Sequence, residues 1–449
     1  MIKKILIANR GEIAARIIRT CKKMAIATVA IYSEADEFAP YVKMADEGYL
    51  IGPPRVNESY MNMEKIIQIA KEADVCAIHP GYGLLSENSE FARKCKEANI
   101  IFIGPSANII EKMGDKITAR KLMKPAGVPV IPGTEGAVKT VAEAKEAVKH
   151  IGYPVMLKAS AGGGGVGLQT VSNEEELEKT FENNSKRAES LFGDGSMFIE
   201  KQLENARHIE VQVLADEHGN TVHLFERECS IQRRNQKVIE EAPATILSEK
   251  TRNLMGEVSV KAVKELGYTN AGTIEFLVDS EEQFYFLEMN TRIQVEHPIT
   301  EEITGIDLIE QQINIASGKI LDMNQSDIIH NGHAIEARIY AEDPKNFFPS
   351  PGKITQYEEP VEKYIRIESS VRNESNVTPF YDPMISKLIV TGESREEAIL
   401  RLKEALGNYK IEGIKTNIPM LIRVVNHEQF KSGNTPTNFV QNFLADKKV

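Results

Sequence analysis

The stretch that decides the fold reads PVMLKASAGGGGVG over residues 154–167. Its apolar first half is typical of a buried strand, and Lys158 ends that half. The four glycines at 162–165 leave the backbone free to adopt positive φ and to turn N–H groups onto an anion. The lysine precedes the glycines, so this is neither Gly-x-x-x-x-Gly-Lys-Ser/Thr nor Gly-x-Gly-x-x-Gly. The run predicts a phosphate-binding loop of another kind, with a plain hairpin tip as the alternative.

Length and composition bound the class of protein. The 449 residues allow two to four domains, and 42% apolar with 27% charged residues is ordinary for a globular chain. The net charge of −11 argues against general nucleic-acid binding. We see neither a secretory signal nor a membrane span, so a cytoplasmic protein without membrane contact is expected. The cysteines have no Cys-x-x-Cys spacing, which favours reduced thiols over a zinc site: Cys21, Cys76, Cys95 and Cys229.

Alternating strand and helix patterns open the chain. Apolar strands are expected at Lys4–Ala8, Thr28–Tyr32 and Asp74–His79, with a helix over Gly11–Met24. This order predicts a mostly parallel sheet whose ligand site lies at the carboxyl ends of its strands. We close this first domain at residue 113.

Glycine and proline clusters and a change in the hydrophobic pattern divide the chain after residue 113. Glycines and prolines at 127–133 suggest a hinge before a small segment that carries the glycine run. From about Phe198 the chain is rich in strand-like alternation, and a further change near Asn331 opens a C-terminal segment. The predicted domains are therefore 1–113, 114–330 and 331–449.

A predicted hairpin brings two carboxylates together. Strand-like runs at Thr273–Val278 and Gln283–Leu287 flank a short acidic turn. If the hairpin is centred between residues 281 and 282, Glu275 falls opposite Glu288, and facing carboxylates repel unless a cation separates them. Magnesium takes such oxygen ligands, and Asn290 offers a third on the same face. The alternative is a surface hairpin whose acids point into water.

Two polar runs carry further candidates. Arg292 and Glu296 could clamp a small anion and remove its proton, although a structural salt bridge is equally compatible with their spacing. The dense polar run at 226–237 has a solvated loop as its commoner explanation and polyphosphate binding as the other. No pair of histidines has metal-ligand spacing.

Taken together and in this order, these segments resemble the ATP-grasp enzymes and, within them, the biotin carboxylases. The matching words are IANRGEIA at 7–14, IHPGYG at 78–83, MGDK at 113–116, KASAGGGG at 158–165, QRR at 232–234 and EMNTRIQVEHP at 288–298. FYDPMI at 380–385 and GIKTN at 413–417 extend the resemblance over nearly the whole chain.

The resemblance implies an α/β and α+β multidomain fold. A Rossmann-like N-terminal domain would precede an ATP-grasp core, with a mobile lid at about 131–204, and a C-terminal biotin carboxylase domain. The implied activity is a ligase that makes carboxyphosphate from ATP and bicarbonate and transfers its carboxyl group to biotin, with Mg²⁺ or Mn²⁺ at two sites.

The resemblance also implies roles for residues. The nucleotide would be bound by Lys116, Lys158, Gly164, Gly165, Glu200, Lys201, Leu203, His208, Gln232 and Asn235. The metal would be held by Glu275, Glu288 and Asn290, and bicarbonate by Lys237, Arg292, Gln294 and the Val295 backbone. Glu296 would deprotonate bicarbonate, while Arg338 and Tyr82 would meet biotin. Asn235 stands where many members have His, and Val166 and Gln169 replace basic residues often found past the glycines.

Partners and alternatives complete the prediction. No Ala-Met-Lys-Met setting for attached biotin is found, so the biotin carboxyl carrier protein is expected to be a separate chain. The resemblance further implies a carboxyltransferase subunit as a partner. A homodimer is expected by resemblance. The final acceptor stays open between acetyl-CoA, pyruvate and 2-oxoglutarate. The alternatives are an ATP-grasp ligase joining a carboxylate to an amine and a non-catalytic nucleotide-binding subunit.

Overall fold

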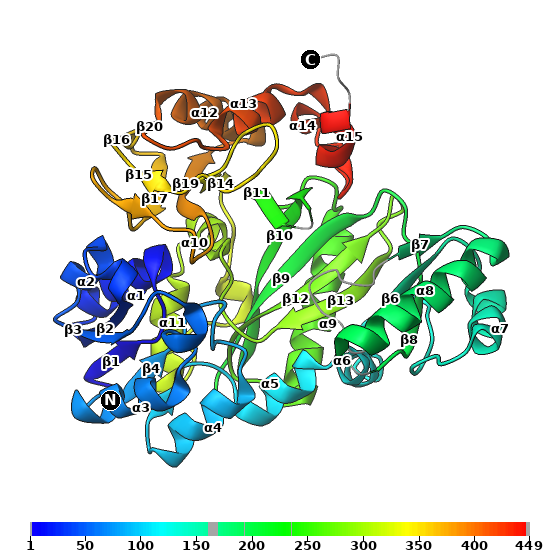
Figure 1. Cartoon of the computed structure of the whole chain (residues 1–449), viewed down its shortest axis with the longest axis horizontal. Coiled ribbons are helices and arrows are strands. Elements are labelled where there is room, and N and C mark those ends of the chain that lie inside the picture. Colours follow the sequence, from blue (N-terminus) through cyan, green and yellow to red (C-terminus); the bar gives the residue numbers. More distant parts are fainter. Residues whose placement is uncertain (1, 160–168, 193, 235, 446–449) are drawn as a thin grey trace.

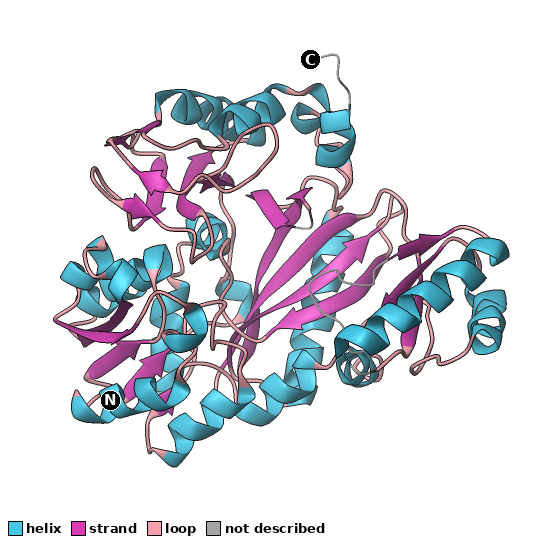
Figure 2. Cartoon of the chain, viewed as in Figure 1, coloured by secondary structure: helices cyan, strands magenta, loops and turns pink. Residues whose placement is uncertain are grey.

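Three bodies surround one long central sheet in the computed structural model, which describes residues 2–159, 169–192, 194–234 and 236–445 (Figure 1). Gly164, Gly165 and Asn235 lie outside these ranges, as does Val166, and their predicted roles stay predictions. Strands run through the middle of the molecule and most helices lie toward its outside (Figure 2). Within the described ranges, no helix is long and apolar enough to cross a membrane.

The N-terminal body is a parallel sheet in the order β3-β2-β1-β4-β5, which confirms the predicted strand type. The order reverses between β1 and β4, where such sheets bind ligands. Asn9, after β1, donates from Nδ2 to the carbonyls of Pro80 (2.7 Å) and Tyr82 (2.8 Å), after β4. Gly81 has a φ of +64°, and a Cβ there would lie 2.9 Å from Asn9 Nδ2, so the close approach needs glycine. The elements are β1 Lys4–Ile7, α1 Gly11–Lys23, β2 Ala27–Ser33, α2 Pro40–Met44, β3 Glu47–Gly52, α3 Met63–Glu72, β4 Ala77–His79, α4 Ser89–Glu97, β5 Ile101–Phe102 and α5 Ala107–Gly114.

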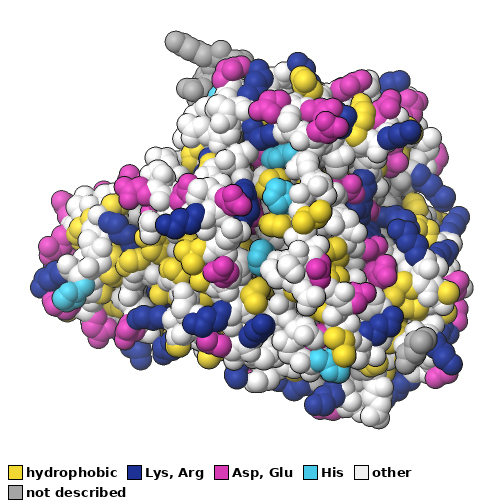
Figure 3. All heavy atoms as spheres, turned by 180° about the vertical axis from the view of Figure 1, so that it is seen from behind, with side chains coloured by type: hydrophobic (Ala, Val, Ile, Leu, Met, Phe, Trp, Pro, Cys, Tyr) yellow, Lys and Arg dark blue, Asp and Glu magenta, His cyan; other side chains and the backbone are white. Residues whose placement is uncertain are grey.

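The segment predicted as a lid forms an arm on the far side of the central sheet from the N-terminal body (Figure 1). Its antiparallel sheet β7-β6-β8 and two helices enclose a small apolar core of their own. Seen from behind, charged side chains of both signs line the rim of this arm, and hydrophobic side chains gather nearer the body (Figure 3). The elements of the arm are α7 Val141–Ile151, β6 Val155–Ala159, β7 Gln169–Val171, α8 Glu174–Phe192 and β8 Met197–Lys201, whereas α6 Lys116–Met123 precedes the arm and packs on the central sheet.

The central sheet has the order β13-β12-β9-β10-β11-β14-β19-β17. Its last three strands come from beyond the predicted boundary at residue 330, so the sheet is continuous between the central and C-terminal segments. The domain boundaries themselves stay predictions. The central elements are β9 Arg207–Ala215, β10 Thr221–Arg233, β11 Gln236–Ala242, α9 Glu249–Leu266, β12 Asn270–Val278, β13 Phe284–Asn290, α10 His297–Thr304 and α11 Leu308–Ala316.

The C-terminal segment packs helices and small sheets over its share of that sheet. Its apolar core also takes in residues of β10 and β11, which ties the segment to the central strands. The elements are β14 His333–Tyr340, β15 Gly352–Lys353, β16 Gln356–Glu358, β17 Ile365–Ser369, β18 Asn376–Val377, β19 Met384–Gly392, α12 Arg395–Asn408, β20 Lys410–Glu412, α13 Ile418–Asn426, α14 Glu428–Lys431 and α15 Phe439–Ala445.

Helix α9 supports the central sheet by packing on β9 and β10. A Cβ on its Gly256 would lie 2.5 Å from Nε2 of the buried His223. We expect Gly256→Ala to lower the free energy of unfolding by about 1–3 kcal/mol, because overpacking displaces the ring and the backbone. Denaturant titration measures this effect. The matched control is Gly407→Ala on the exposed side of α12, where nothing lies within 4 Å of the place that a methyl group would take, and it should not lower stability.

Candidate active site

A row of carboxylates crosses neighbouring strands of the central sheet. Glu275 on β12 pairs in register with Glu210 on β9 on one side and with Glu288 on β13 on the other. The Glu275 and Glu288 pairing confirms the predicted register. The predicted turn centre is wrong, because a bulge between Glu275 and Phe276 shifts the register nearer the turn.

Lys237 on β11 neutralises one end of this row. Its Nζ lies 2.6 Å from Glu210 Oε2, 2.9 Å from Glu275 Oε1 and 2.6 Å from Glu296 Oε1. Burial alone would lower the pKa of Lys237, but the three carboxylates outweigh it and hold that pKa well above its usual value. The ammonium is therefore charged at any working pH and joins the carboxylate row to Glu296.

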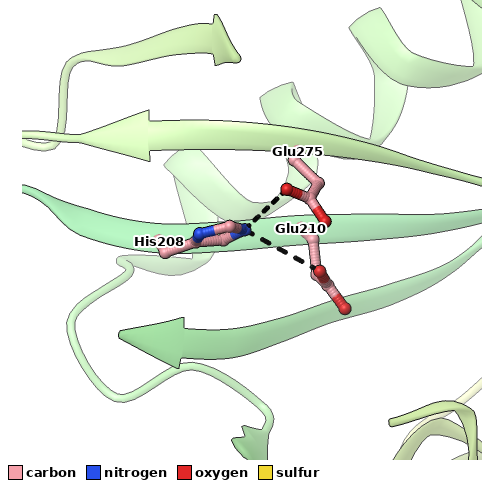
Figure 4. A group of neighbouring side chains, drawn as sticks. All are labelled: His208, Glu210 and Glu275. Atoms are coloured by element: carbon pink, nitrogen blue, oxygen red, sulfur yellow. Dashed lines mark ion pairs between the residues drawn. The ribbon is translucent and has the colours of Figure 1, made fainter. Parts of the chain in front are cut away.

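His208 and Glu275 point toward each other from β9 and β12 (Figure 4). His208 Nε2 lies 3.0 Å from Glu275 Oε2 and 3.9 Å from Glu210 Oε2, while its Nδ1 lies 3.0 Å from Gln232 Nε2. Burial would raise the pKa of Glu275, but Lys237 and His208 hold it well below the ordinary value. Glu275 is thus a charged carboxylate.

Glu288 is the member of the row without a cation. Within the described part of the chain, no lysine, arginine or histidine nitrogen lies within 4.0 Å of it. Burial first, and then repulsion by Glu275, raise its pKa. It lines a cavity of about 190 Å³ together with Lys116, Glu87 and Asn290. A divalent cation between Glu275 and Glu288 would remove this repulsion, so the two carboxylates fit a magnesium ion.

Asn290 lies beside this pair, but its amide nitrogen, and not its oxygen, faces Glu275. Its Nδ2 donates to Glu275 Oε1 (2.8 Å), and its Oδ1 accepts from Arg292 Nη2 (2.8 Å). For Asn290 to ligate a metal its amide would have to turn over.

Glu296 stands at the start of α10 between two cations. Its Oε1 accepts from Lys237, and its Oε2 accepts from Arg338 Nη2 at 3.0 Å. Burial would raise its pKa, but Lys237, Arg338 and Arg227 hold that pKa well below the usual value. The carboxylate is ionised and able to accept a proton. Arg338 in turn donates from Nε to Glu240 Oε1 at 2.6 Å.

Arg292 lies apart from the contacts of Lys237. Its Nε donates to Glu87 Oε2 (2.8 Å), and Glu87 Oε1 also accepts from the Thr291 backbone (3.1 Å). Glu87 follows β4 in the N-terminal body, and we did not predict a role for it. Its place at the carboxyl end of a parallel strand was the available signal.

The polar run at 226–237 is not a solvated loop, so that interpretation is wrong. Apart from Arg234, in a turn, and Asn235, outside the described residues, the run belongs to β10 and β11, and the side chain of Arg227 is fully buried. Arg227 donates to Glu210 Oε1 (2.6 Å) and to Gln294 Oε1 (2.7 Å), and Gln294 donates to Glu275 Oε1 (2.7 Å). Its partners lie far along the chain, which kept it out of the sequence prediction.

The residues predicted for bicarbonate and biotin reach the same region. Lys387, also missed, donates from Nζ to the Val295 carbonyl (2.7 Å) and lies 3.2 Å from Glu12 Oε1. Tyr82 donates its hydroxyl to the same Glu12 oxygen. Tyr82, from the loop after β4, is therefore brought close to Lys387, which pairs in register with Arg338.

The predicted nucleotide residues of the arm are held in internal contacts. Lys158 pairs with Glu200 Oε2, whose other oxygen accepts from Arg120 Nη1 at 3.1 Å. Lys201 Nζ donates to the Tyr153 carbonyl at 2.7 Å. Leu203 is half-buried just after β8. Lys158 would have to leave Glu200 to reach a phosphate.

Comparison with known proteins agrees with this architecture. Family descriptions match consecutive parts of the chain: "Biotin carboxylase, N-terminal domain" at 1–110, "Carbamoyl-phosphate synthase L chain, ATP binding domain" at 115–324 and "Biotin carboxylase C-terminal domain" at 336–442. These matches confirm the predicted fold class.

Curated relatives and solved structures cover the whole chain. "Biotin carboxylase 2" of Bacillus subtilis is 62% identical over 99% of this chain and 100% of its own length. A crystal structure of the biotin carboxylase subunit of pyruvate carboxylase is 51% identical, covers 100% of both chains and has a TM-score of 0.87. A crystal structure of the 2-oxoglutarate carboxylase biotin carboxylase domain dimer of Hydrogenobacter thermophilus, with MgADP, ADP and bicarbonate, is 50% identical, covers 100% of both chains and has a TM-score of 0.94. The chain therefore belongs to the biotin carboxylase family.

Proposed function

We propose that this protein carboxylates biotin, using ATP and bicarbonate, through carboxyphosphate. One observation carries the proposal: Lys237 contacts both Glu275, in the pair that fits a metal, and Glu296, the ionised carboxylate. A metal–nucleotide site and a general base thus share one cation.

In the first step, bicarbonate would lie between Arg292, Lys237, Gln294 and the Val295 backbone. An oxygen of bicarbonate attacks the γ-phosphorus of ATP, ADP leaves, and the bicarbonate proton passes to Glu296. Because the pKa of Glu296 is depressed, it is a weak base and cannot remove this proton in advance. Proton transfer therefore accompanies the attack on phosphorus.

Cations would neutralise charge on the transferring phosphoryl group. Glu275 and Glu288, with Asn290 after its amide turns, would hold Mg²⁺ or Mn²⁺, which supplies charge neutralisation at the phosphates. Lys116 lines the same cavity as Glu288 and would reach the phosphates from the other side. Lys158, Gly164 and Gly165 would close over them from the arm. The remaining nucleotide contacts are assigned to Glu200, Lys201, Leu203, His208, Gln232 and Asn235.

In the second step, carboxyphosphate would release phosphate, the biotin ureido N–H would give its proton to that phosphate, and the ureido nitrogen would bond to the carboxyl carbon. Arg338 would meet the negative charge that develops on the ureido oxygen. A guanidinium in a buried site stabilises such a developing charge more strongly than it would in water. Tyr82 would line the biotin site beside Glu12.

We also propose the wider setting. The protein would work in the cytoplasm as a homodimer, with biotin carried on a separate carrier protein and with a carboxyltransferase completing the assembly. The names of the relatives include pyruvate and 2-oxoglutarate carboxylases, so the acceptor stays open. Identification of the biotinylated protein that co-purifies with this chain would select between acceptors.

The test of the function is ADP release with and without free biotin. In the presence of Mg²⁺ and bicarbonate, biotin is expected to accelerate ADP release and to become carboxylated, as followed by trapping of ¹⁴C-carboxybiotin. A ligase that joins a carboxylate to an amine would not respond to biotin. ADP release that is indifferent to biotin would contradict the proposal, and absence of ATP cleavage would favour a non-catalytic role.

A further inference from the structure

Two fully buried carboxyl groups face each other behind Arg338. Glu240 on β11 pairs in register with Glu336 on β14, and the side chains of both are excluded from solvent. Arg338 follows two residues after Glu336 and therefore lies on the same face of the strand. Two facing buried charges of one sign are strongly unfavourable.

The hydrogen bonds of this pair are unequal. Glu240 Oε1 accepts from Arg338 Nε at 2.6 Å and lies 2.6 Å from Arg338 Nη2 in an ion pair. Glu240 Oε2 and both oxygens of Glu336 have no hydrogen-bond partner among the described residues. Lys387, opposite Arg338 on β19, directs its Nζ to Val295 and Glu12 instead.

The surrounding charges favour one proton on the pair. Around it lie Arg338, Lys387 and Lys237 as cations, and Glu296, Glu12, Tyr82 and Tyr340 as the other titratable groups. Burial first, opposed by Lys387 and reinforced by Glu240, holds the pKa of Glu336 well above its usual value. Burial also raises the pKa of Glu240, to about 7, against the attraction of Arg338.

We propose that Glu240 is a positioning residue that fixes the guanidinium of Arg338 for biotin, and that Glu336, facing it, stays neutral. With a neutral Glu336, the pair carries a single negative charge. That charge orients Arg338, whose own charge then remains available to the substrate. A second ionisation would place another negative charge beside Arg338 and weaken its interaction with the developing charge on biotin. This inference rests on the proposed function.

The first test is Glu240→Gln. Carboxybiotin formation should fall about 10- to 100-fold, the scale of a misplaced catalytic group, while bicarbonate-dependent ATP cleavage without biotin stays within about 3-fold. The matched control is Glu241→Gln. Glu241 is the next residue of β11 and binds Arg395 (2.6 Å) and His333 (2.8 Å) instead, so its loss should lower stability and leave the ratio of carboxybiotin to ADP unchanged. If Glu240→Gln does not fold, Glu240→Asp should show a smaller loss of carboxybiotin formation, again with ATP cleavage retained.

The second test is the pH profile of Glu336→Gln. In the wild type, the ratio of carboxybiotin to ADP should fall as pH rises and the second carboxyl ionises. In the Gln variant, which cannot ionise, this alkaline fall should disappear. A Glu240→Gln variant that loses both activities equally, or an unchanged profile in Glu336→Gln, would overturn the inference while leaving the function intact. A wild type that makes no carboxybiotin would overturn both.

Discussion

Glu296→Ala is expected to abolish both bicarbonate-dependent ATP cleavage and carboxybiotin formation, whereas Arg338→Gln should separate the two. Glu296 is proposed to accept the bicarbonate proton, so its loss stops the first step and everything after it. Arg338 is proposed to meet charge that develops only on biotin, so carboxybiotin should fall about 10²-fold or more while ATP cleavage survives.

The contact between these two residues sharpens the expectation. Arg338 Nη2 lies 3.0 Å from Glu296 Oε2 and is one of the cations that depress the pKa of Glu296. Removing it raises that pKa and makes Glu296 a stronger base, still ionised near neutral pH because Lys237 and Arg227 remain. This change in the pKa of Glu296 should therefore not make ATP cleavage slower in Arg338→Gln than in the wild type.

The measurement is ADP release with bicarbonate, with and without biotin, beside trapped ¹⁴C-carboxybiotin. Survival of ATP cleavage in Arg338→Gln would itself show that the variant folds. The division of roles is contradicted if Arg338→Gln loses both activities in equal measure, or if Glu296→Ala retains ATP cleavage.

Local patterns predicted the hairpin pair because both members lie on one short stretch of chain. The facing of Glu275 and Glu288 needed only strand periodicity and a turn position. The error near the turn came from the bulge at Glu275 and Phe276, which inserts one residue and leaves no distinctive sequence signal.

Contacts between distant segments could not be predicted in the same way. Glu210 joins the carboxylate row only because β9 pairs with β12, and Arg227 is buried only because β9 and β11 flank β10. The run that contains Arg227 is rich in charge, and charge is ordinarily typical of solvent-exposed segments. Likewise Glu87 and Arg292 are 205 residues apart. The resemblance to a family supplied the roles of the site residues, whereas the sheet order supplied their neighbours.

Glu288→Gln is expected to remove most of the activity. The Mg²⁺ concentration at which the variant reaches half of its own maximal activity should be about 10-fold or more above that of the wild type. The row of carboxylates gives the reason. Arg227 and Lys237 between them balance Glu210 and Glu275, so Glu288 is the charge left for a metal to neutralise. Removing that charge weakens the attraction for the cation although the glutamine carbonyl can still lie in the same place.

Thermal unfolding gives this prediction a readout that does not depend on turnover. Without metal, Glu288→Gln should be at least as stable as the wild type, because the repulsion between facing carboxylates is gone. On addition of Mg²⁺ the wild type should gain more stability than the variant, because a ligand that binds the folded state more tightly stabilises that state more at the same concentration. The matched control is Glu281→Gln at the exposed turn of the same hairpin, which should keep the wild-type response to Mg²⁺ in both assays. Equal stabilisation of the wild type and Glu288→Gln by Mg²⁺ would mean that the facing pair does not hold the metal.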